Sequence, residues 1–357
     1  MRVRGTAHRR RHHGIVALAA GSLVVAAAVT GVGPAAAQGT AGSSRGQAHS
    51  YAFDAPDAAA VVGSDLFVTN HANNSVTEVN ASNGSYVATL SGKSFGFDGP
   101  AAIVAVGGDL FVANRSDNSL SEFKASDRQP VRTIHGATYK FAYPGALASS
   151  GQDLFVLNAR SITEVATGSG ALIGTVSGSV FGFDRPTGLT VADGRIFVAN
   201  SASDTVTVVN ATTRAFVASL GGSPFNFSTP KGIAFDGTNL WVTNQGDESV
   251  TEFSPTTLDE LTVLVSGNLP MVGPITYGDG YVFAVSPPGS SPMVSQITPS
   301  PATVNWMMCN TNGPYLFNNP QALVVAGTDL WVVNEGGNSL TEMETVTGAL
   351  IRTVDNP

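Results

Sequence analysis

Residues 53–90 read FDAPDAAAVVGSDLFVTNHANNSVTEVNASNGSYVATL, and the same arrangement recurs through the rest of the chain. Each copy contains a proline and short apolar runs separated by polar turns, and in every copy except the sixth an aromatic residue stands three positions before the proline. The prolines, spaced 44, 44, 42, 44, 44 and 46 residues apart, are Pro56, Pro100, Pro144, Pro186, Pro230, Pro274 and Pro320. Seven copies in register indicate a repeat protein with one structural unit per copy.

Other positions recur at fixed distances from these prolines. Every copy except the sixth carries an aromatic pair: Tyr51 and Phe53, Phe95 and Phe97, Tyr139 and Phe141, Phe181 and Phe183, Phe225 and Phe227, Tyr315 and Phe317. The second apolar run ends in asparagine in six copies: Asn70, Asn114, Asn158, Asn200, Asn244 and Asn334. A side-chain amide that ends a strand can bond the backbone of the following turn, and we expect this role for the asparagines.

A period near 44 with four short β-rich runs per copy is typical of a propeller blade. In the first copy the expected strands are 58–62, 66–70, 75–80 and 86–90. Charged residues make up only 12% of the chain, and 40 glycines supply turns, as in a well-buried β protein. The sequence therefore predicts an all-β fold, a seven-bladed β-propeller of four-stranded antiparallel blades.

The repeats join without a linker, so we expect one domain over residues 51–357. The predicted blades lie near 53–96, 97–140, 141–182, 183–226, 227–269, 270–316 and 317–357. The final segment LIRTVDNP aligns with YVATLSGK of the first copy, so each copy is complete. We expect no strand exchange at the ring closure, with Tyr51 and Phe53 sealing the seam.

Residues 1–37 have the pattern of an export signal. Five arginines are followed by an apolar stretch over 14–32 and by the small-x-small pair Ala35 and Ala37. We predict a cleaved signal peptide, cut after Ala37, a flexible linker over 38–50, and secretion. The alternative is an uncleaved N-terminal membrane anchor, because the apolar stretch is nearly long enough to span a bilayer.

The charge balance restricts the partners. Removing the five leader arginines leaves 18 − 5 = 13 basic residues against 26 acidic ones, a net charge near −13. Such a surface repels nucleic acid and anionic lipid, so neither is an expected partner. The single cysteine, Cys309, allows no internal disulfide. We expect a monomer.

Segments such as LFVTNHANNSVTEV, LFVANRSDNSLSEF and LWVVNEGGNSLTEM resemble the YVTN and NHL classes of secreted β-propeller repeat. The resemblance covers residues 51–357, is weak in the sixth copy, and implies a binding or scaffold module with a protein or cell-envelope glycan as partner. Its enzymatic alternative is a divalent-metal-dependent lyase or lactone hydrolase of the streptogramin-lyase-like type. That chemistry uses His and Glu on one face, whereas residues 38–357 contain only His49, His71 and His135.

The candidate site is the mouth of the central channel, because the residue after each proline starts the innermost strand. These residues differ between copies: Asp57, Ala101, Gly145, Thr187, Lys231, Ile275 and Gln321. Loops between second and third runs add His71, Arg115, Asp117, Asp204, Asp247, Glu248 and Glu335. We predict a polar, mostly acidic mouth that binds ligand through Asp57, Thr187, Lys231, Gln321, His71, Arg115, Asp204, Asp247 and Glu335. The alternative is ordinary solvated turn chemistry.

Acidic loops also raise Ca²⁺ or Mg²⁺ as a cofactor, although no D-x-D-x-D-G loop occurs and ligands would have to come from several blades. Glutamates recur in the third run at Glu78, Glu122, Glu164, Glu252 and Glu342. They lie too far from the axis to share an ion, so we expect them to accept backbone or hydroxyl hydrogen bonds between blades. We therefore assign neither catalytic residues nor metal ligands. The divergent sixth copy is a second candidate surface, for protein docking.

Overall fold

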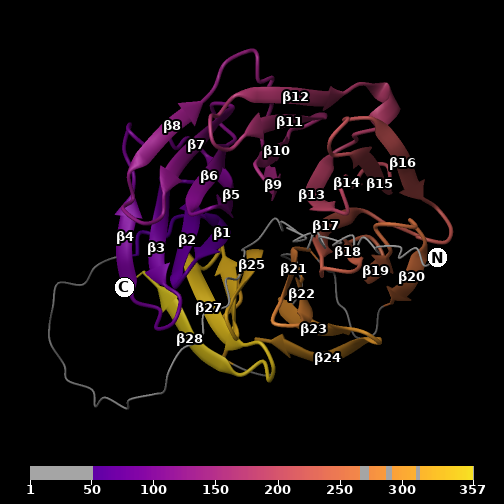
Figure 1. Cartoon of the computed structure of the whole chain (residues 1–357). Coiled ribbons are helices and arrows are strands. Elements are labelled where there is room, and N and C mark those ends of the chain that lie inside the picture. Colours follow the sequence, from indigo (N-terminus) through magenta and orange to yellow (C-terminus); the bar gives the residue numbers. More distant parts are fainter. Residues whose placement is uncertain (1–50, 266–272, 287–291, 311–313, 357) are drawn as a thin grey trace, which may run out of the picture.

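The computed structural model describes residues 51–265, 273–286, 292–310 and 314–356. Seven four-stranded antiparallel sheets are arranged in a ring around a central channel (Figure 1). Within these ranges the only helical segment is the short 3₁₀ turn η1, Ser179–Phe181, and no helix is long and apolar enough to cross a membrane. The predicted seven-bladed all-β propeller is confirmed. The predicted signal peptide and linker lie outside the described residues.

Each sheet is a blade whose four strands follow one another along the chain. Blades 1 to 3 comprise β1 Pro56–Val62, β2 Asp65–Asn70, β3 Ser75–Asn80, β4 Tyr86–Leu90, β5 Pro100–Val106, β6 Asp109–Asn114, β7 Ser119–Lys124, β8 Pro130–Ile134, β9 Ala146–Ser150, β10 Asp153–Leu157, β11 Ser161–Ala166 and β12 Leu172–Ser177. Blades 4 and 5 comprise β13 Pro186–Ala192, β14 Arg195–Asn200, β15 Thr205–Asn210, β16 Phe216–Gly221, β17 Pro230–Phe235, β18 Leu240–Asn244, β19 Ser249–Phe253 and β20 Glu260–Leu264. Blades 6 and 7 comprise β21 Ile275–Gly278, β22 Tyr281–Val285, β23 Met293–Pro299, β24 Ala302–Cys309, β25 Pro320–Ala326, β26 Asp329–Asn334, β27 Ser339–Glu344 and β28 Leu350–Asp355.

The first strand of each blade faces the channel and the fourth lies at the rim (Figure 1). Neighbouring blades cover both faces of the middle strands, which explains their continuous apolar sequence. In β2, for example, Leu66, Phe67 and Val68 are all buried. Blade 6 keeps this core, because Trp306 and Met308 of β24 pack against a buried cluster that blades 6 and 7 share.

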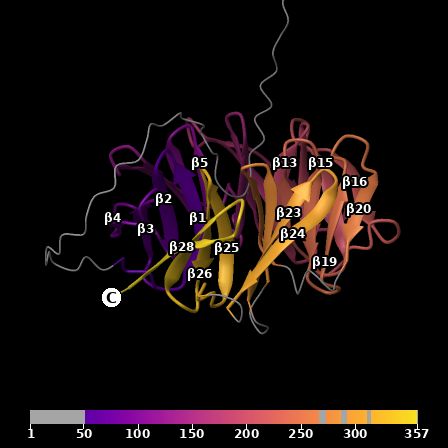
Figure 2. The ribbon, with the colours of Figure 1, turned by 90° about the horizontal axis from the view of Figure 1, so that it is seen from below.

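The ring closes as predicted, without exchange of a strand. Strands β1 to β4 and β25 to β28 form complete, separate sheets, and β1 lies beside β25 (Figure 2). Phe53 is buried at this seam with Trp331 and Val333 of blade 7, and the Tyr51 ring stacks on it at 5.5 Å between centroids. The Asn338 side chain of blade 7 accepts a hydrogen bond from the Ala55 amide of blade 1 at 2.9 Å.

The repeated asparagines connect three segments rather than the following turn alone. The Asn70 side-chain Nδ2 donates to Ser75 Oγ and Thr77 Oγ1 of the next strand, at 3.1 and 2.9 Å. Its Oδ1 accepts the amide of Asp54, which precedes β1. Asn114 and Asn244 repeat this pattern. The buried asparagine amide therefore holds the loop that leads into the innermost strand of the blade.

The third-strand glutamates have partners that differ from the prediction. Four of them form ion pairs with arginine: Glu78 with Arg128, Glu122 with Arg132, Glu164 with Arg214 and Glu342 with Arg352. Glu252 instead accepts a hydrogen bond from Asn239 at 2.7 Å. Buried carboxylates need strong compensation, and here charged guanidinium groups supply it in place of the expected hydroxyl or backbone donors.

The guanidinium reaches the glutamate from one of two places. Arg132 pairs across the sheet with Glu122 in its own blade, and its side chain covers Gly170 in the turn of the next blade. Blade 3 has Gly174 at the position of Arg132, and Arg214 comes from the turn of blade 4 to occupy the space that Gly174 leaves. Both of these junctions combine one arginine with one glycine, on opposite sides.

Candidate ligand-binding site in the central channel

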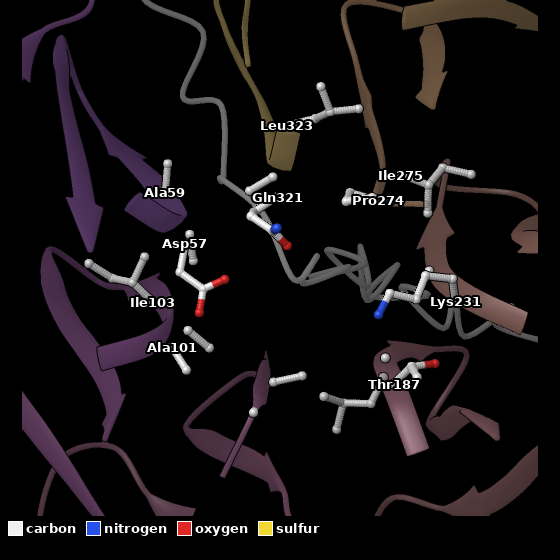
Figure 3. Close-up of a pocket in the computed structure, with 18 of the residues that line it drawn as sticks. Asp57, Ala59, Ala101, Ile103, Thr187, Lys231, Pro274, Ile275, Gln321 and Leu323 are labelled. Atoms are coloured by element: carbon white, nitrogen blue, oxygen red, sulfur yellow. The ribbon is translucent and has the colours of Figure 1, made fainter. Parts of the chain in front are cut away.

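The channel contains a cavity of about 280 Å³ at the ends of the innermost strands. All seven residues that follow the repeated prolines line it, as the sequence predicts: Asp57, Ala101, Gly145, Thr187, Lys231, Ile275 and Gln321. Asp57 and Lys231 lie on opposite sides of the channel and both point toward its centre (Figure 3). Arg115, from the turn after β6, lines the same cavity.

The local backbone explains why these side chains reach the axis. The residue before the proline has a left-handed φ in six blades: Ala55, Gly99, Tyr143, Arg185, Thr229 and Asn319. In five blades the proline then starts the strand, and the pairing register shifts immediately after it. Such bulges redirect a side chain, here toward the channel.

Crowding at the axis accounts for the small residues that follow. A Cβ on Gly232 would lie 2.8 Å from Ile275 Cγ2 and 2.9 Å from the Gly273 carbonyl oxygen of blade 6. A Cβ on Gly188 would lie 3.4 Å from the Lys231 carbonyl oxygen. Backbone atoms and small side chains therefore form much of the cavity wall, and only a few polar side chains are available to bind a ligand.

Two of the lining polar residues are bonded to the protein itself. Thr187 Oγ1 donates to the Pro230 carbonyl oxygen at 2.9 Å and so links blade 4 to blade 5. Gln321 Nε2 donates to Glu335 Oε2 at 2.6 Å and to Asn319 Oδ1 at 3.0 Å. These contacts hold both side chains in place, and both retain an oxygen that can accept a hydrogen bond.

The three charged lining residues are different. Among the described residues, no ion pair or side-chain hydrogen bond engages Asp57, Arg115 or Lys231. Burial raises the pKa of Asp57 to about 6, although Arg115, His71 and Lys231 act to lower it and Glu335 to raise it. One cavity is therefore lined by three charged groups for which no described residue provides an ion pair or a side-chain hydrogen bond.

The charges are divided between two sides of the mouth. Arg115 extends over blade 3, where its Nη2 would lie 3.0 Å from a Cβ on Gly145. A second cavity of about 230 Å³ shares Arg115, Gly145, Thr187 and Lys231 with the first. Asp57 and Glu335 belong to blades 1 and 7. In the channel cavity itself the charged lining residues are two cations and one carboxylate, because the acidic residues expected from the loops do not line it.

The remaining predicted residues form two groups, one close to Asp57 and one bonded to the backbone or side chains of turns. His71 and Glu335 border the cavity without lining it, near enough to affect the pKa of Asp57. Asp204 Oδ1 accepts the Thr229 amide at 2.6 Å, and Asp247 Oδ1 accepts the Ser249 hydroxyl at 2.7 Å. These two aspartates thus have the turn role that was the alternative reading.

Tyr143 is a site residue that the sequence analysis missed. It lines the second cavity, its side chain is exposed, and its amide donates to Asn118 Oδ1 at 2.7 Å. The position before the repeated proline holds Ala55, Gly99 and Thr229 in three other blades. A single bulky aromatic residue at this repeated position was the available signal.

The residues that line the cavity do not fit the Ca²⁺ or Mg²⁺ cofactor suggested by the acidic loops. Within the described ranges, no group of three His, Cys, Asp or Glu side chains could hold a metal ion. Ca²⁺ takes six to eight oxygen ligands. In this cavity the Asp57 carboxylate faces two cations, whose charge opposes that of a divalent ion.

No protein-family model and no curated protein sequence matches the chain. Solved β-propellers do match its fold. Virginiamycin B lyase from Staphylococcus aureus has 17% identity and a TM-score of 0.61, over 74% of this chain and 86% of that one. Hydrazine synthase from Kuenenia stuttgartiensis has 14% identity and a TM-score of 0.67, over 85% and 99%. The WD40 repeats of RRP9 have 14% identity and a TM-score of 0.58, over 75% and 83%. At these identities the similarity concerns the fold alone.

Proposed function

We propose that this protein is a binding module whose small-molecule ligand occupies the central channel. The observation that carries the proposal is the set of three charged side chains, Asp57, Arg115 and Lys231, that line one cavity without partners among the described residues. Charged groups in a partly desolvated cavity are costly unless something pairs with them. A ligand with complementary charge supplies that pairing.

The scaffold suits this role, because seven blades fix the start of every lining strand. Ligand sites preferentially occupy such preformed concave surfaces with a few convergent polar groups. The basic and apolar leader over residues 1–37 supports export, and the repeats resemble the YVTN and NHL classes. We propose a secreted or cell-surface monomer that meets cell-envelope material, glycan or protein, outside the cell.

The alternative function, a metal-dependent lyase or lactone hydrolase, has less support. At 17% identity, the similarity to virginiamycin B lyase is evidence for a shared fold only. The charges of the lining do not match a divalent ion, and we derive no catalytic step from them. Metal dependence is nevertheless one arm of the test.

The test is thermal unfolding of the purified protein against a panel of anionic, cationic, zwitterionic and neutral small molecules, with Ca²⁺, Mg²⁺ and EDTA as further arms. A ligand at 100 times its dissociation constant stabilises the protein by about 2.7 kcal/mol. The variants are Asp57→Asn, Arg115→Gln and Lys231→Met. Lys124→Met, at the exposed end of β7, is the matched control for loss of a positive charge.

We expect at least one compound to raise the melting temperature, and the three channel variants, but not Lys124→Met, to reduce that shift. A stabilising compound whose effect is the same in all variants would place the site elsewhere. If no compound in the panel acts, the proposal of a small-molecule channel site is overturned.

A further inference from the structure

The channel presents opposite charges on facing walls. Lys231 and Asp57 point toward each other across the cavity (Figure 3). Arg115 and Lys231 both line the second cavity, which adjoins blades 3 and 4. On the other side, Glu335 bonds Gln321 close to Asp57. The cavity therefore has a cationic wall and an acidic wall.

The cationic wall is suited to a carboxylate. Arginine presents a planar set of donors that binds a carboxylate through two parallel hydrogen bonds, and lysine adds a mobile positive charge. Both cations border the same space, together with the Thr187 hydroxyl, whose proton is directed to the Pro230 carbonyl. An anionic group placed there gains two charged partners that no described residue engages.

The acidic wall is suited to an ammonium group. Asp57 carries two acceptor oxygens, and none is used by a described residue. The Gln321 amide nitrogen is occupied by Glu335 and Asn319, which leaves its carbonyl oxygen as an acceptor beside Asp57. A group with several N–H donors satisfies these oxygens, whereas a second anion would meet repulsion from Asp57 and Glu335.

We propose that the channel ligand is a small zwitterion, with its carboxylate held by Arg115 and Lys231 and its ammonium group by Asp57. This inference rests on the proposed channel site and adds the chemical class of its ligand. A cavity of about 280 Å³ accommodates a molecule of monomer size, such as an amino acid. A ligand with both charges is neutral overall, so the acidic surface of the protein does not exclude it.

The probes are linear amino acids of increasing length: glycine, β-alanine, 4-aminobutyrate and 6-aminohexanoate. The controls for each probe are the carboxylic acid and the amine of the same length, which retain one charge each, such as butyrate and butylamine for 4-aminobutyrate. Calorimetric titration gives the dissociation constant of each probe. We expect one length to bind at least tenfold more tightly than its single-charge controls, because each lost charged hydrogen bond costs about this factor.

The variants assign the two ends of the ligand. Asp57→Asn is expected to weaken the zwitterion about tenfold and to leave butyrate binding unchanged or improved. Lys231→Met and Arg115→Gln are expected to weaken both the zwitterion and butyrate. Lys124→Met is expected to change neither. Circular dichroism of each variant separates loss of binding from loss of the fold.

A pH series adds a readout that a purely structural role for Asp57 would not give. Because burial raises the pKa of Asp57 to about 6, zwitterion affinity is expected to fall as the pH drops through 6 and the carboxylate takes up a proton. His71, Glu335, Arg115 and Lys231 are the other charged or titratable groups around it. The fall is expected to persist in His71→Gln and to vanish in Asp57→Asn.

The outcomes separate this proposal from the one on which it rests. If no amino acid of the series binds more tightly than its single-charge controls, the zwitterion proposal is overturned. Channel binding of neutral or singly charged compounds, sensitive to Lys231→Met, would then leave the proposed function standing. If neither the amino acids nor any panel compound responds to the channel variants, both proposals fail.

Discussion

Asn356 and Phe53 exchange two hydrogen bonds across the ring closure. The Phe53 amide donates to Asn356 Oδ1 at 3.1 Å, and Asn356 Nδ2 donates to the Phe53 carbonyl oxygen at 2.7 Å. The side chain after β28 thus holds the backbone that leads into β1, in the manner of a further β bridge. Residues 303 positions apart are joined by one amide.

Asn356→Ala is therefore expected to destabilise the whole ring. Loss of both bonds leaves a partly buried amide and carbonyl unpaired and lowers the free energy of unfolding by about 1–3 kcal/mol. Urea denaturation measures this value, with Ser94→Ala at an exposed position as the control. An Asn356→Ala protein as stable as the control would show that the ring closure does not depend on these two hydrogen bonds.

The junction between blades 1 and 2 offers a test of the Glu78–Arg128 pair. Blade 4 has Val208 at the glutamate position, and Leu258 of blade 5 packs at its apolar junction in the position of Arg128. Arg128→Leu alone leaves the buried Glu78 carboxylate unpaired and is expected to cost about 1–3 kcal/mol.

Adding Glu78→Val to Arg128→Leu is expected to restore most of that loss, because the pair then matches the apolar junction of blades 4 and 5. Replacing a buried ion pair by packed apolar residues is often neutral or stabilising. Denaturant unfolding of both single variants and the double variant measures the coupling. A double variant no more stable than Arg128→Leu would contradict this interpretation.

Glu342 is expected to contribute a pH dependence to stability. Burial is the main reason that the pKa of Glu342 rises from 4.5 to about 7, while Arg352 lowers it and Asp329 raises it. The folded protein then holds a proton that the unfolded chain releases between about pH 4.5 and 7. This contribution to the free energy of unfolding is complete below pH 4.5 and is lost as the pH rises to 7.

Glu342→Gln removes that titration, so its unfolding free energy should depend less on pH than that of the parent between pH 4.5 and 7. Comparison of the two proteins by urea denaturation at several pH values isolates Glu342 from the other carboxyl groups. Parallel pH profiles would show that Glu342 titrates normally in the fold.

Gly232→Ala tests the crowding at the axis. The added methyl group would approach the Gly273 carbonyl oxygen of blade 6 to 2.9 Å, where the backbone cannot give way cheaply. We expect a loss of about 1–3 kcal/mol from overpacking. Gly168→Ala, with no atom within 4 Å of the new Cβ, is the control and is expected to have little effect. Equal effects in a melting experiment would contradict the crowding argument.

The fold could be predicted because its evidence is repeated seven times in the sequence. The expected strands 75–80 and 86–90 coincide with β3 and β4. The positions that line the channel followed from their fixed distance to the prolines. The repeated strands and channel positions could therefore be predicted from a single sequence.

The electrostatics of the mouth could not be predicted in this way, because they depend on contacts between blades. Arg115 belongs to a turn of blade 2 but lies over Gly145 of blade 3. Asp204 has the same formal charge as Asp57 but caps the amide of Thr229. The sequence alone does not distinguish these two carboxylates. In the structure Asp57 points into the channel cavity, whereas Asp204 points to the backbone of the next blade.

The two origins of the guanidinium at the blade junctions restrict how such a ring can be rearranged. A blade whose turn carries Gly170 needs a neighbour that supplies Arg132, and a blade whose turn carries Arg214 needs a neighbour with Gly174. Exchanging blades 2 and 3, for example, would place Arg132 and Arg214 at one junction and leave the buried Glu78 carboxylate uncompensated at another. At the four junctions with a Glu–Arg pair, each blade is thus matched to the neighbour that precedes it, and part of the blade order is encoded in pairs of side chains at the rim.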